Sequence, residues 1–367
     1  MMQRFDAGIR LNCNELCKVK HNWNMALQTV TYAPRAFELL RGFFCIYKPA
    51  NLSIHYVRKI IIGNLCRDLN EMEVRPPTDF VKIVGSLASG KELTITTVPN
   101  LADHPLVVGQ RYQAKDIKLT WVHDIGRYPS GVMVMGVHAS HRKLLKLRHS
   151  NQLRSYELRG EFGKASDTLT PDSKIVEQAT YGHITIAKME RLLSSIQATH
   201  QVQAFKYSGV RMDSQEAYEL AAAGTVRPAD KSPMLIYNIR CTEFDLPFFT
   251  LEVSCLNENA SYLLQLVHDI GLRLRSCALC HRVRQVRYGQ FGLDHALLRK
   301  HWNLEHILNN INHCRHLVTW EQLEPSSPHL VDVDASFSSP ARTFGGTRDL
   351  ARPYDRAVRT TECGVLE

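Results

Sequence analysis

A strand–helix–strand series between residues 249 and 287 is the pattern that most constrains the fold of this chain. Apolar residues alternate with polar ones from Phe249 to Cys255, and again from Cys280 to Arg287, which is typical of β-strands. Between these strands, apolar residues recur at helical spacing from Tyr262 to Leu274. The series predicts a mixed sheet flanked by helices.

Further segments fit the same fold class. A second buried strand is predicted at Val132–Met135, because this apolar run follows the turn residues Pro129-Ser130-Gly131. The other predicted elements are a strand at Phe43–Tyr47, a loop over 68–80, a helix through Ile186–Ile196, a helix opened by an Asp213–Glu216 capping box and closed by Gly224, and a short helix from Asp294. Neighbouring strands follow one another directly, so the fold class is α/β of the α+β type rather than a regular βαβ series.

Three regions are predicted along the chain. Residues 1–40 lack clean periodicity and carry a mild basic excess, so they are interpreted as an N-terminal extension that permits mitochondrial targeting. Residues 41–324 form the folded domain. Residues 325–367 are rich in Ser, Pro, Gly, Arg and Asp and are predicted to be a disordered tail. No apolar run reaches the length of a membrane span, so an integral membrane protein is excluded.

Positive charge is concentrated in two segments. The whole chain has a net charge of +9, while residues 142–159 and residues 271–288 each carry +5. Clustering of this kind is expected where a protein contacts phosphates, although two solvated faces would give the same counts. The charge therefore favours a polyanionic partner.

A metal or haem site is the alternative suggested by Cys277, Cys280 and His281. Their spacing fits covalent haem attachment or half of a zinc site. The three residues lie between a helix and an alternating strand, and no second Cys pair with ligand spacing follows them. We therefore interpret these cysteines as structural, and we expect no metal and no cofactor.

Five spaced motifs resemble the TruB family of pseudouridine synthases, most closely its animal mitochondrial branch. The resemblance covers residues 42–302, and its motifs are Gly42–Ala50, Arg154-Ser155-Tyr156 with Ser166-Asp167-Thr168, Tyr207-Ser208 with Arg211 and Tyr218-Glu219, Asp269-Ile270-Gly271, and Arg284 with Gly289-Gln290-Phe291. Their order along the chain is the family order.

The resemblance implies a pseudouridine synthase fold, with a mixed, mainly antiparallel sheet crossed by an RNA cleft. It also implies that a uridine is flipped out of its stack, because its base must be detached and rejoined through carbon. Tyr156 would stack on that base. The implied partner is mitochondrial mRNA, tRNA or rRNA, and the implied location is the mitochondrion.

Two positions depart from the family pattern. The family nucleophile is an Asp five residues before a Gly that corresponds to Gly131, and Gly126 occupies that position. The family Arg that pairs with this Asp lies seven residues before Gly271, where the chain has Leu264. Asp124 is an alternative nucleophile if the loop has gained two residues.

Two functions therefore stay open, and both involve RNA. The first is a TruB-type enzyme that isomerises uridine in RNA. The second is a catalytically inactive RNA-binding scaffold or chaperone for mitochondrial RNA. The residues predicted to contact RNA in either case are Lys48, Arg142, Lys143, Arg154, Tyr207, Arg211, Arg273, Arg275 and Arg284.

Overall fold

The computed structural model describes residues 31–73, 79–85, 93–100, 105–150, 152–223, 226 and 232–319. The chain divides into two units, Met1–Asp332 and Val333–Glu367, and every described residue belongs to the first. The predicted tail, 325–367, lies outside the described residues. Within the described part, no helix is both long enough and apolar enough to cross a membrane.

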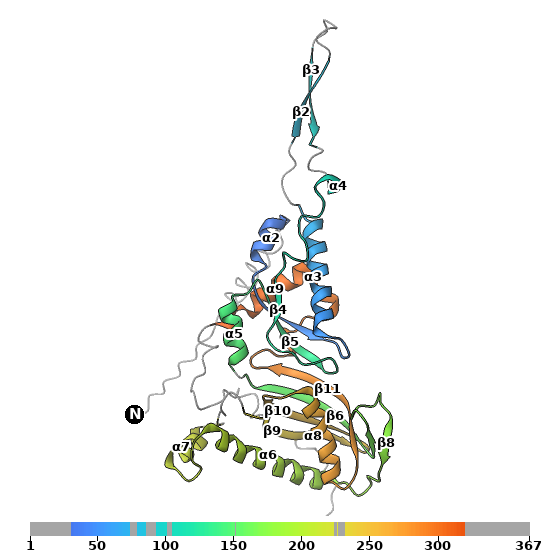
Figure 1. Ribbon diagram of the computed structural model, residues 1–367, viewed down its shortest axis with the longest axis vertical. Coiled ribbons are helices and arrows are strands. Elements are labelled where there is room, and N and C mark those ends of the chain that lie inside the picture. The colour runs from blue at the N-terminus through green and yellow to red at the C-terminus, as the bar shows by residue number, and fades with distance from the viewer. Residues whose placement is uncertain are drawn as a thin grey trace, which may run out of the picture. The chain divides into compact units, whose positions relative to one another are not determined.

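The strands and helices alternate irregularly along the chain (Figure 1). The strands are β1 (Gly42–Lys48), β2 (Asp79–Val84), β3 (Thr94–Pro99), β4 (Leu119–Trp121), β5 (Ser130–Val137), β6 (Arg154–Phe162), β7 (Lys164–Ser166), β8 (Ile175–Gln178), β9 (Leu235–Asp245), β10 (Phe248–Leu256) and β11 (Ala278–Tyr288). The α-helices are α2 (Ala33–Leu39), α3 (Ile54–Glu71), α4 (Pro105–Val108), α5 (His141–His149), α6 (Ile186–Ser208), α7 (Gln215–Ala223), α8 (Ala260–Arg273) and α9 (Leu304–Cys314). Short 3₁₀ turns are η3 (Leu293–His295), η4 (Arg299–His301) and η5 (Arg315–Val318).

Seven strands form the central sheet. Its neighbours run in the order β1-β5-β11-β6-β10-β9, and β4 pairs with β5. All of these pairs are antiparallel except β5 with β11, which run parallel where Ser130 faces Arg284 and Gly131 faces Gln285. The prediction of a mixed, mainly antiparallel sheet is confirmed, as are the predicted strands at 43–47, 132–135, 249–255 and 280–287.

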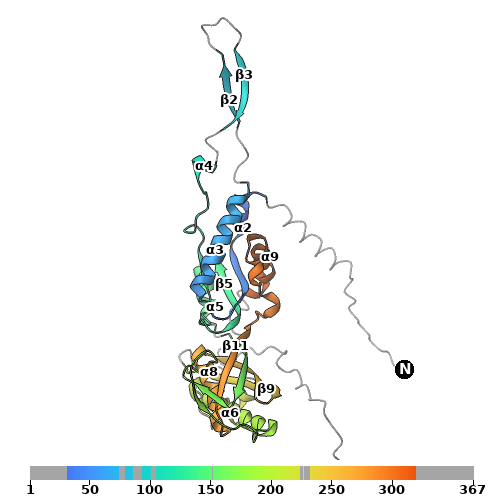
Figure 2. The same cartoon turned by 90° about the vertical axis from the view of Figure 1, so that its right-hand side faces the viewer.

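Two groups of helices cover this sheet (Figure 2). Helices α3 and α9 pack with β1 and β5 around a core that includes Phe44 and Ile61. Helices α6 and α8 pack on β9 and β11 around a second core that includes Leu251 and Val267. The buried residues of α8 are three or four positions apart, so one face of this helix is apolar, as its sequence predicts.

Gly131 permits the parallel contact between β5 and β11. Its φ is +127°, and a Cβ added at this position would lie 2.1 Å from the backbone oxygen of Gln285. A side chain would therefore separate the two strands. The glycine allows β5 to approach β11 closely, and Tyr128 of the loop that precedes β5 contacts the backbone of β11.

Helix α2 lies within the segment that the sequence analysis assigns to an N-terminal extension. Ala33, Ala36 and Leu40 are fully buried, and they belong to the same core as Phe44. Proline at the first turn favours helix initiation there. Part of the 1–40 segment is thus folded with the domain, and residues 1–30 lie outside the described part.

Three local predictions differ from the structure. The predicted loop at 68–80 is partly wrong, because α3 continues to Glu71 and β2 begins at Asp79. Helix α7 is capped by Ser214, whose Oγ accepts a hydrogen bond from the Ala217 amide at 3.2 Å, while the Asp213 carboxylate pairs with Arg211. The segment after Asp294 forms only 3₁₀ turns before α9.

Candidate functional site

The loop between β4 and β5 contains the predicted nucleophile position, and Lys48 holds this loop in place. Because β1 and β5 are antiparallel, Lys48 faces Gly131 at the start of β5. Its side chain is fully buried, and Nζ donates hydrogen bonds to the carbonyl oxygens of Pro129 (2.6 Å), Arg127 (3.0 Å) and Pro49 (3.1 Å). Burial lowers the pKa of Lys48 to about 8. The ammonium group is enclosed by carbonyl oxygens, so the predicted phosphate contact of Lys48 would require this loop to open, and it stays a prediction.

Gly126 lies against the first turn of α8. Its φ is +80°, and a Cβ added there would meet the Cβ of Ala260 at 3.5 Å, which is ordinary van der Waals contact. The Gly126 amide donates a hydrogen bond to Asp124 Oδ1 at 2.8 Å, which closes a local turn. The Asp124 side chain is exposed. The carboxylate of this turn, Asp124, therefore accepts a hydrogen bond from a backbone amide and is otherwise in contact with solvent.

Leu264 on α8 makes apolar contacts. It packs, partly buried, against the core that contains Tyr156, and Tyr128 of the loop packs against the same core. The Tyr128 hydroxyl lies 3.0 Å from the Cys280 carbonyl oxygen and 2.9 Å from that of His281, and it donates to this pair of acceptors on β11. The site therefore has an apolar side chain where the family pattern has an arginine.

A buried ion pair is nevertheless present, and it joins residues other than the family pair. Arg154 at the start of β6 pairs with Glu258 in the connection between β10 and α8, and these side chains are 20% and 4% exposed. The Tyr156 hydroxyl donates a hydrogen bond to the same carboxylate oxygen, Glu258 Oε1, at 2.7 Å. Burial and the nearby carboxylate raise the pKa of Tyr156 well above its ordinary value. Glu258 Oε2 has no hydrogen-bond partner among the described residues.

His123 connects the loop to this ion pair. Its ring stacks on Tyr288, with centroids 4.1 Å apart, and the Arg154 guanidinium lies 5.3 Å from the centroid of the same Tyr288 ring. His123 Nε2 lies 3.0 Å from Gln285 Oε1, so this nitrogen carries the proton that it donates to the amide oxygen. Burial lowers the pKa of His123 to about 3, so the ring is neutral at physiological pH.

The predicted RNA-binding residues fall into separate groups. Arg154 and Tyr156 come together on one face of β6, where both contact Glu258, whereas Arg284 on β11 pairs with Glu157 on the other face, at 3.7 Å. The remaining predicted contacts lie on α5 (Arg142 and Lys143), at the end of α6 (Tyr207 and Arg211), and at the end of α8 (Arg273 and Arg275). Tyr156 is only 3% exposed, so base stacking on its ring requires neighbouring groups to move.

Cys277, Cys280 and His281, the residues of the alternative metal or haem site, each have other surroundings. Cys277 and Cys280 are buried free thiols, and His281 Nε2 lies 2.6 Å from Glu161 Oε2. Among the residues that the structure describes, no group of three or more His, Cys, Asp or Glu side chains could hold a metal ion.

Glu258, His123 and Gln285 are site residues that the sequence analysis misses. Tyr156 and Glu258 lie 102 positions apart, and His123 and Gln285 lie 162 positions apart. An acidic residue directly before the amphipathic α8 is visible in the sequence, but its burial beside Arg154 depends on the pairing of β6 with β10.

Comparison with known proteins agrees with the motifs. Residues 115–260 match the family described as TruB family pseudouridylate synthase (N terminal domain). A Xenopus tropicalis protein named "Pseudouridylate synthase TRUB2, mitochondrial" is 37% identical over 324 residues, which cover 87% of this chain and 98% of the relative. The human protein of the same name is 38% identical and is covered over 89% of its length, with 79% of this chain matched.

Solved structures give a more distant match. One described as "Crystal structure of the archaeal box H/ACA sRNP Nop10-Cbf5 complex" has a TM-score of 0.39 and 12% identity. The match covers 78% of this chain and 58% of that one, so this chain spans less than two thirds of its length. The two TRUB2 relatives, in contrast, are covered over 98% and 89% of their length. On the basis of these relatives and the motifs, the chain belongs to the TruB family of pseudouridylate synthases.

Proposed function

We propose that this chain is an RNA-binding protein of the mitochondrion that acts on a uridine in mRNA, tRNA or rRNA, as a TruB-type pseudouridine synthase. The observation that carries the proposal is the 37% identity to a mitochondrial pseudouridylate synthase over 98% of that relative. Arg154 and Tyr156 would lie at the centre of the RNA cleft, with Tyr156 stacking on the target base. No cofactor is required, because isomerisation of uridine needs no external oxidant or reductant.

Residues 126 and 264 favour a second candidate function, in which the protein binds RNA without isomerising uridine. Nucleophilic catalysis requires a carboxylate within reach of the base, and Gly126 has no side chain. Leu264 packs in an apolar core, so an Asp at residue 126 would have no arginine partner there. Asp124 is exposed and is engaged by the Gly126 amide. This candidate is a scaffold or chaperone for mitochondrial RNA.

A direct assay separates the two candidates. The purified full chain is mixed with uridine-containing RNA, and both RNA binding and pseudouridine content are measured for the wild type, Asp124→Ala and Asp79→Ala. We expect all three proteins to bind RNA with an affinity that falls as salt rises, because phosphate contacts release counterions. Asp79 is exposed on β2 and serves as the matched control for loss of a carboxylate.

The product measurement then decides between the candidates. Pseudouridine that is lost in Asp124→Ala but kept in Asp79→Ala supports the enzyme and assigns the nucleophile to Asp124. Absence of product from a chain that binds RNA supports the scaffold, provided that a TruB-family enzyme with both the Asp and the Arg modifies the same RNA. Failure of the wild type to bind any RNA at low salt contradicts both candidates.

A further inference from the structure

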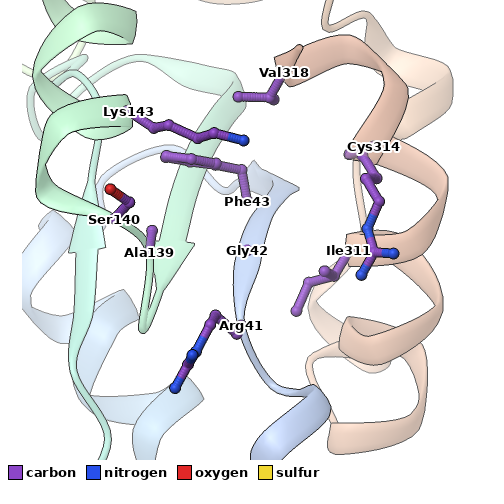
Figure 3. A pocket seen from close by; sticks show the side chains of 10 residues that line it. Arg41, Gly42, Phe43, Ala139, Ser140, Lys143, Ile311, Cys314 and Val318 are labelled. Carbon is purple, nitrogen blue, oxygen red and sulfur yellow. The ribbon is translucent and has the colours of Figure 1, made fainter. Parts of the chain in front are cut away.

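A cavity of about 230 Å³ lies apart from the site described above. Three segments that are distant in the sequence line it: the start of β1 with Arg41 and Phe43, the start of α5 with Ser140 and Lys143, and α9–η5 with Arg315 and Val318. Figure 3 shows Lys143 and Arg41 at opposite ends of the cavity, with Phe43 and Ile311 between them. Basic side chains therefore lie at separate points around the cavity, with apolar side chains between them.

The charged side chains that line this cavity are all basic. Its lining includes Arg41, Lys143 and Arg315 and no Asp or Glu. None of the salt bridges found among the described residues involves Arg41 or Arg315. Two guanidinium groups and an ammonium group around one cavity favour an anion, and guanidinium groups suit phosphate because they donate two parallel hydrogen bonds.

The apolar side chains of the cavity suit an apolar group attached to that anion. Phe43, Ile311 and Val318 are 6%, 3% and 5% exposed, so a base would pack closely on them only after neighbouring groups move, as at Tyr156. A free inorganic anion would make no use of these side chains. The volume is below the range of about 300 to 1,000 Å³ that is usual for drug-sized ligands, so the cavity would hold only part of a larger ligand. A nucleotide within an RNA chain combines a charged phosphate with a less polar ribose and base.

We propose that this cavity is a second contact site for RNA, in which the phosphates on either side of one nucleotide contact the basic side chains around the cavity, Arg41, Lys143 and Arg315, while the ribose and base between them lie over Phe43, Ile311 and Val318. The proposal rests on the proposed function, since it takes the partner to be RNA. In the sheet order, β11 separates β5 from β6, so this contact is distinct from the Arg154–Tyr156 site. It would hold a bound RNA at a nucleotide that is not the target uridine.

The test measures RNA affinity of the full chain against salt concentration. In the Arg41→Gln/Arg315→Gln variant we expect affinity to fall about tenfold, because charged hydrogen bonds to the backbone phosphates are lost. The slope of log affinity against log salt should become shallower by about 0.7 for each phosphate contact of a single strand that is lost. Arg35→Gln/Lys59→Gln removes the same charge from exposed positions on α2 and α3 and is the matched control.

A second variant tests the cavity without a change of charge. Ser140 is exposed at the start of α5 and its side chain makes no capping hydrogen bond, so Ser140→Trp should fold and fill the opening. We expect it to weaken RNA binding about as much as the double charge variant. Crosslinking of bound RNA by ultraviolet light should also place a nucleotide on the peptide that contains Phe43.

The outcomes separate this proposal from the proposed function. If the wild type binds RNA but the Arg41/Arg315 and Ser140 variants bind as well as the control, the cavity proposal is overturned and the proposed function stands. Equal losses of RNA affinity in the Arg41/Arg315 variant and in the Arg35/Lys59 control would also overturn it, because the loss would then come from the lower net charge and not from the cavity. If the wild type binds no RNA, both proposals fail together.

Discussion

Replacing Glu258 by alanine is expected to lower the free energy of unfolding by about 3 to 5 kcal/mol. The substitution leaves the Arg154 guanidinium, which is 20% exposed, without its counter-ion. It also removes the acceptor for the Tyr156 hydroxyl, which is hydrogen-bonded at 2.7 Å. Once the partner is removed, the buried charge and the buried hydroxyl have neither a protein partner nor enough water to solvate them, and this destabilises the folded state. Chemical denaturation of the purified variant measures the loss.

Two controls define what this loss means. Glu252→Ala removes a carboxylate from β10 that pairs with Arg240. The Glu252 side chain is 27% exposed and that of Arg240 is 36% exposed, so we expect the free energy of unfolding to fall by less than about 1 kcal/mol. Replacing the whole group, as Arg154→Met/Tyr156→Phe/Glu258→Leu, should restore stability to within about 1 kcal/mol of the wild type. Equal costs for Glu258→Ala and Glu252→Ala would contradict the burial of the Arg154–Glu258 pair.

Replacing Lys48 by methionine is expected to lower the free energy of unfolding by about 3 kcal/mol. Methionine fills a similar volume but donates nothing to the carbonyl oxygens of Pro49, Arg127 and Pro129. Each buried acceptor left without a donor costs about 1 kcal/mol or more. The matched control is Lys59→Met at an exposed position of α3, which should change stability by less than about 0.5 kcal/mol.

The effect of Lys48 also depends on pH. Its pKa falls from 10.5 to about 8 on folding, because burial disfavours the charged form. Between these values the unfolded chain binds more protons at Lys48 than the folded chain does, so stability from this group rises with pH. The difference in unfolding free energy between wild type and Lys48→Met should therefore grow by about 1 kcal/mol from pH 8 to pH 9 and stay constant below pH 7. A pH-independent difference would contradict the burial of this ammonium group.

The sheet was predictable from the sequence because its strands have local patterns. Residues 249–255 and 280–287 alternate, and Val132–Met135 is a continuous apolar run, so each could be assigned without knowledge of its neighbours. The positions of Gly126 and Leu264 also follow from motif spacing alone. By contrast, α2 was missed, because a short helix with only a few buried residues has little periodicity to detect.

The buried site was not predictable, because its contacts join residues that are far apart in the chain. Lys48 has the sequence features of an exposed turn lysine, and only the pairing of β1 with β5 buries it. Arg154 likewise has the features of a phosphate contact, being part of a basic segment. Its partner Glu258 is an isolated acid in the sequence, and the pairing of β6 with β10 brings the two together.

The parallel contact at Gly131 has a consequence for the order of folding. Ser130 and Gly131 meet Arg284 and Gln285 only after the chain has closed a loop that contains β6, β9 and β10, and such closures are slow because of their entropy. We therefore expect the loop around Gly126 to gain structure after the hairpin of β9 and β10. Pulsed hydrogen exchange during refolding would show this as later protection of the amides at the parallel contact, Ser130, Gly131, Arg284 and Gln285, than of those between β9 and β10, and the reverse order would contradict it. The loop around Gly126 would then take its place beside β11 only in molecules that have completed their sheet.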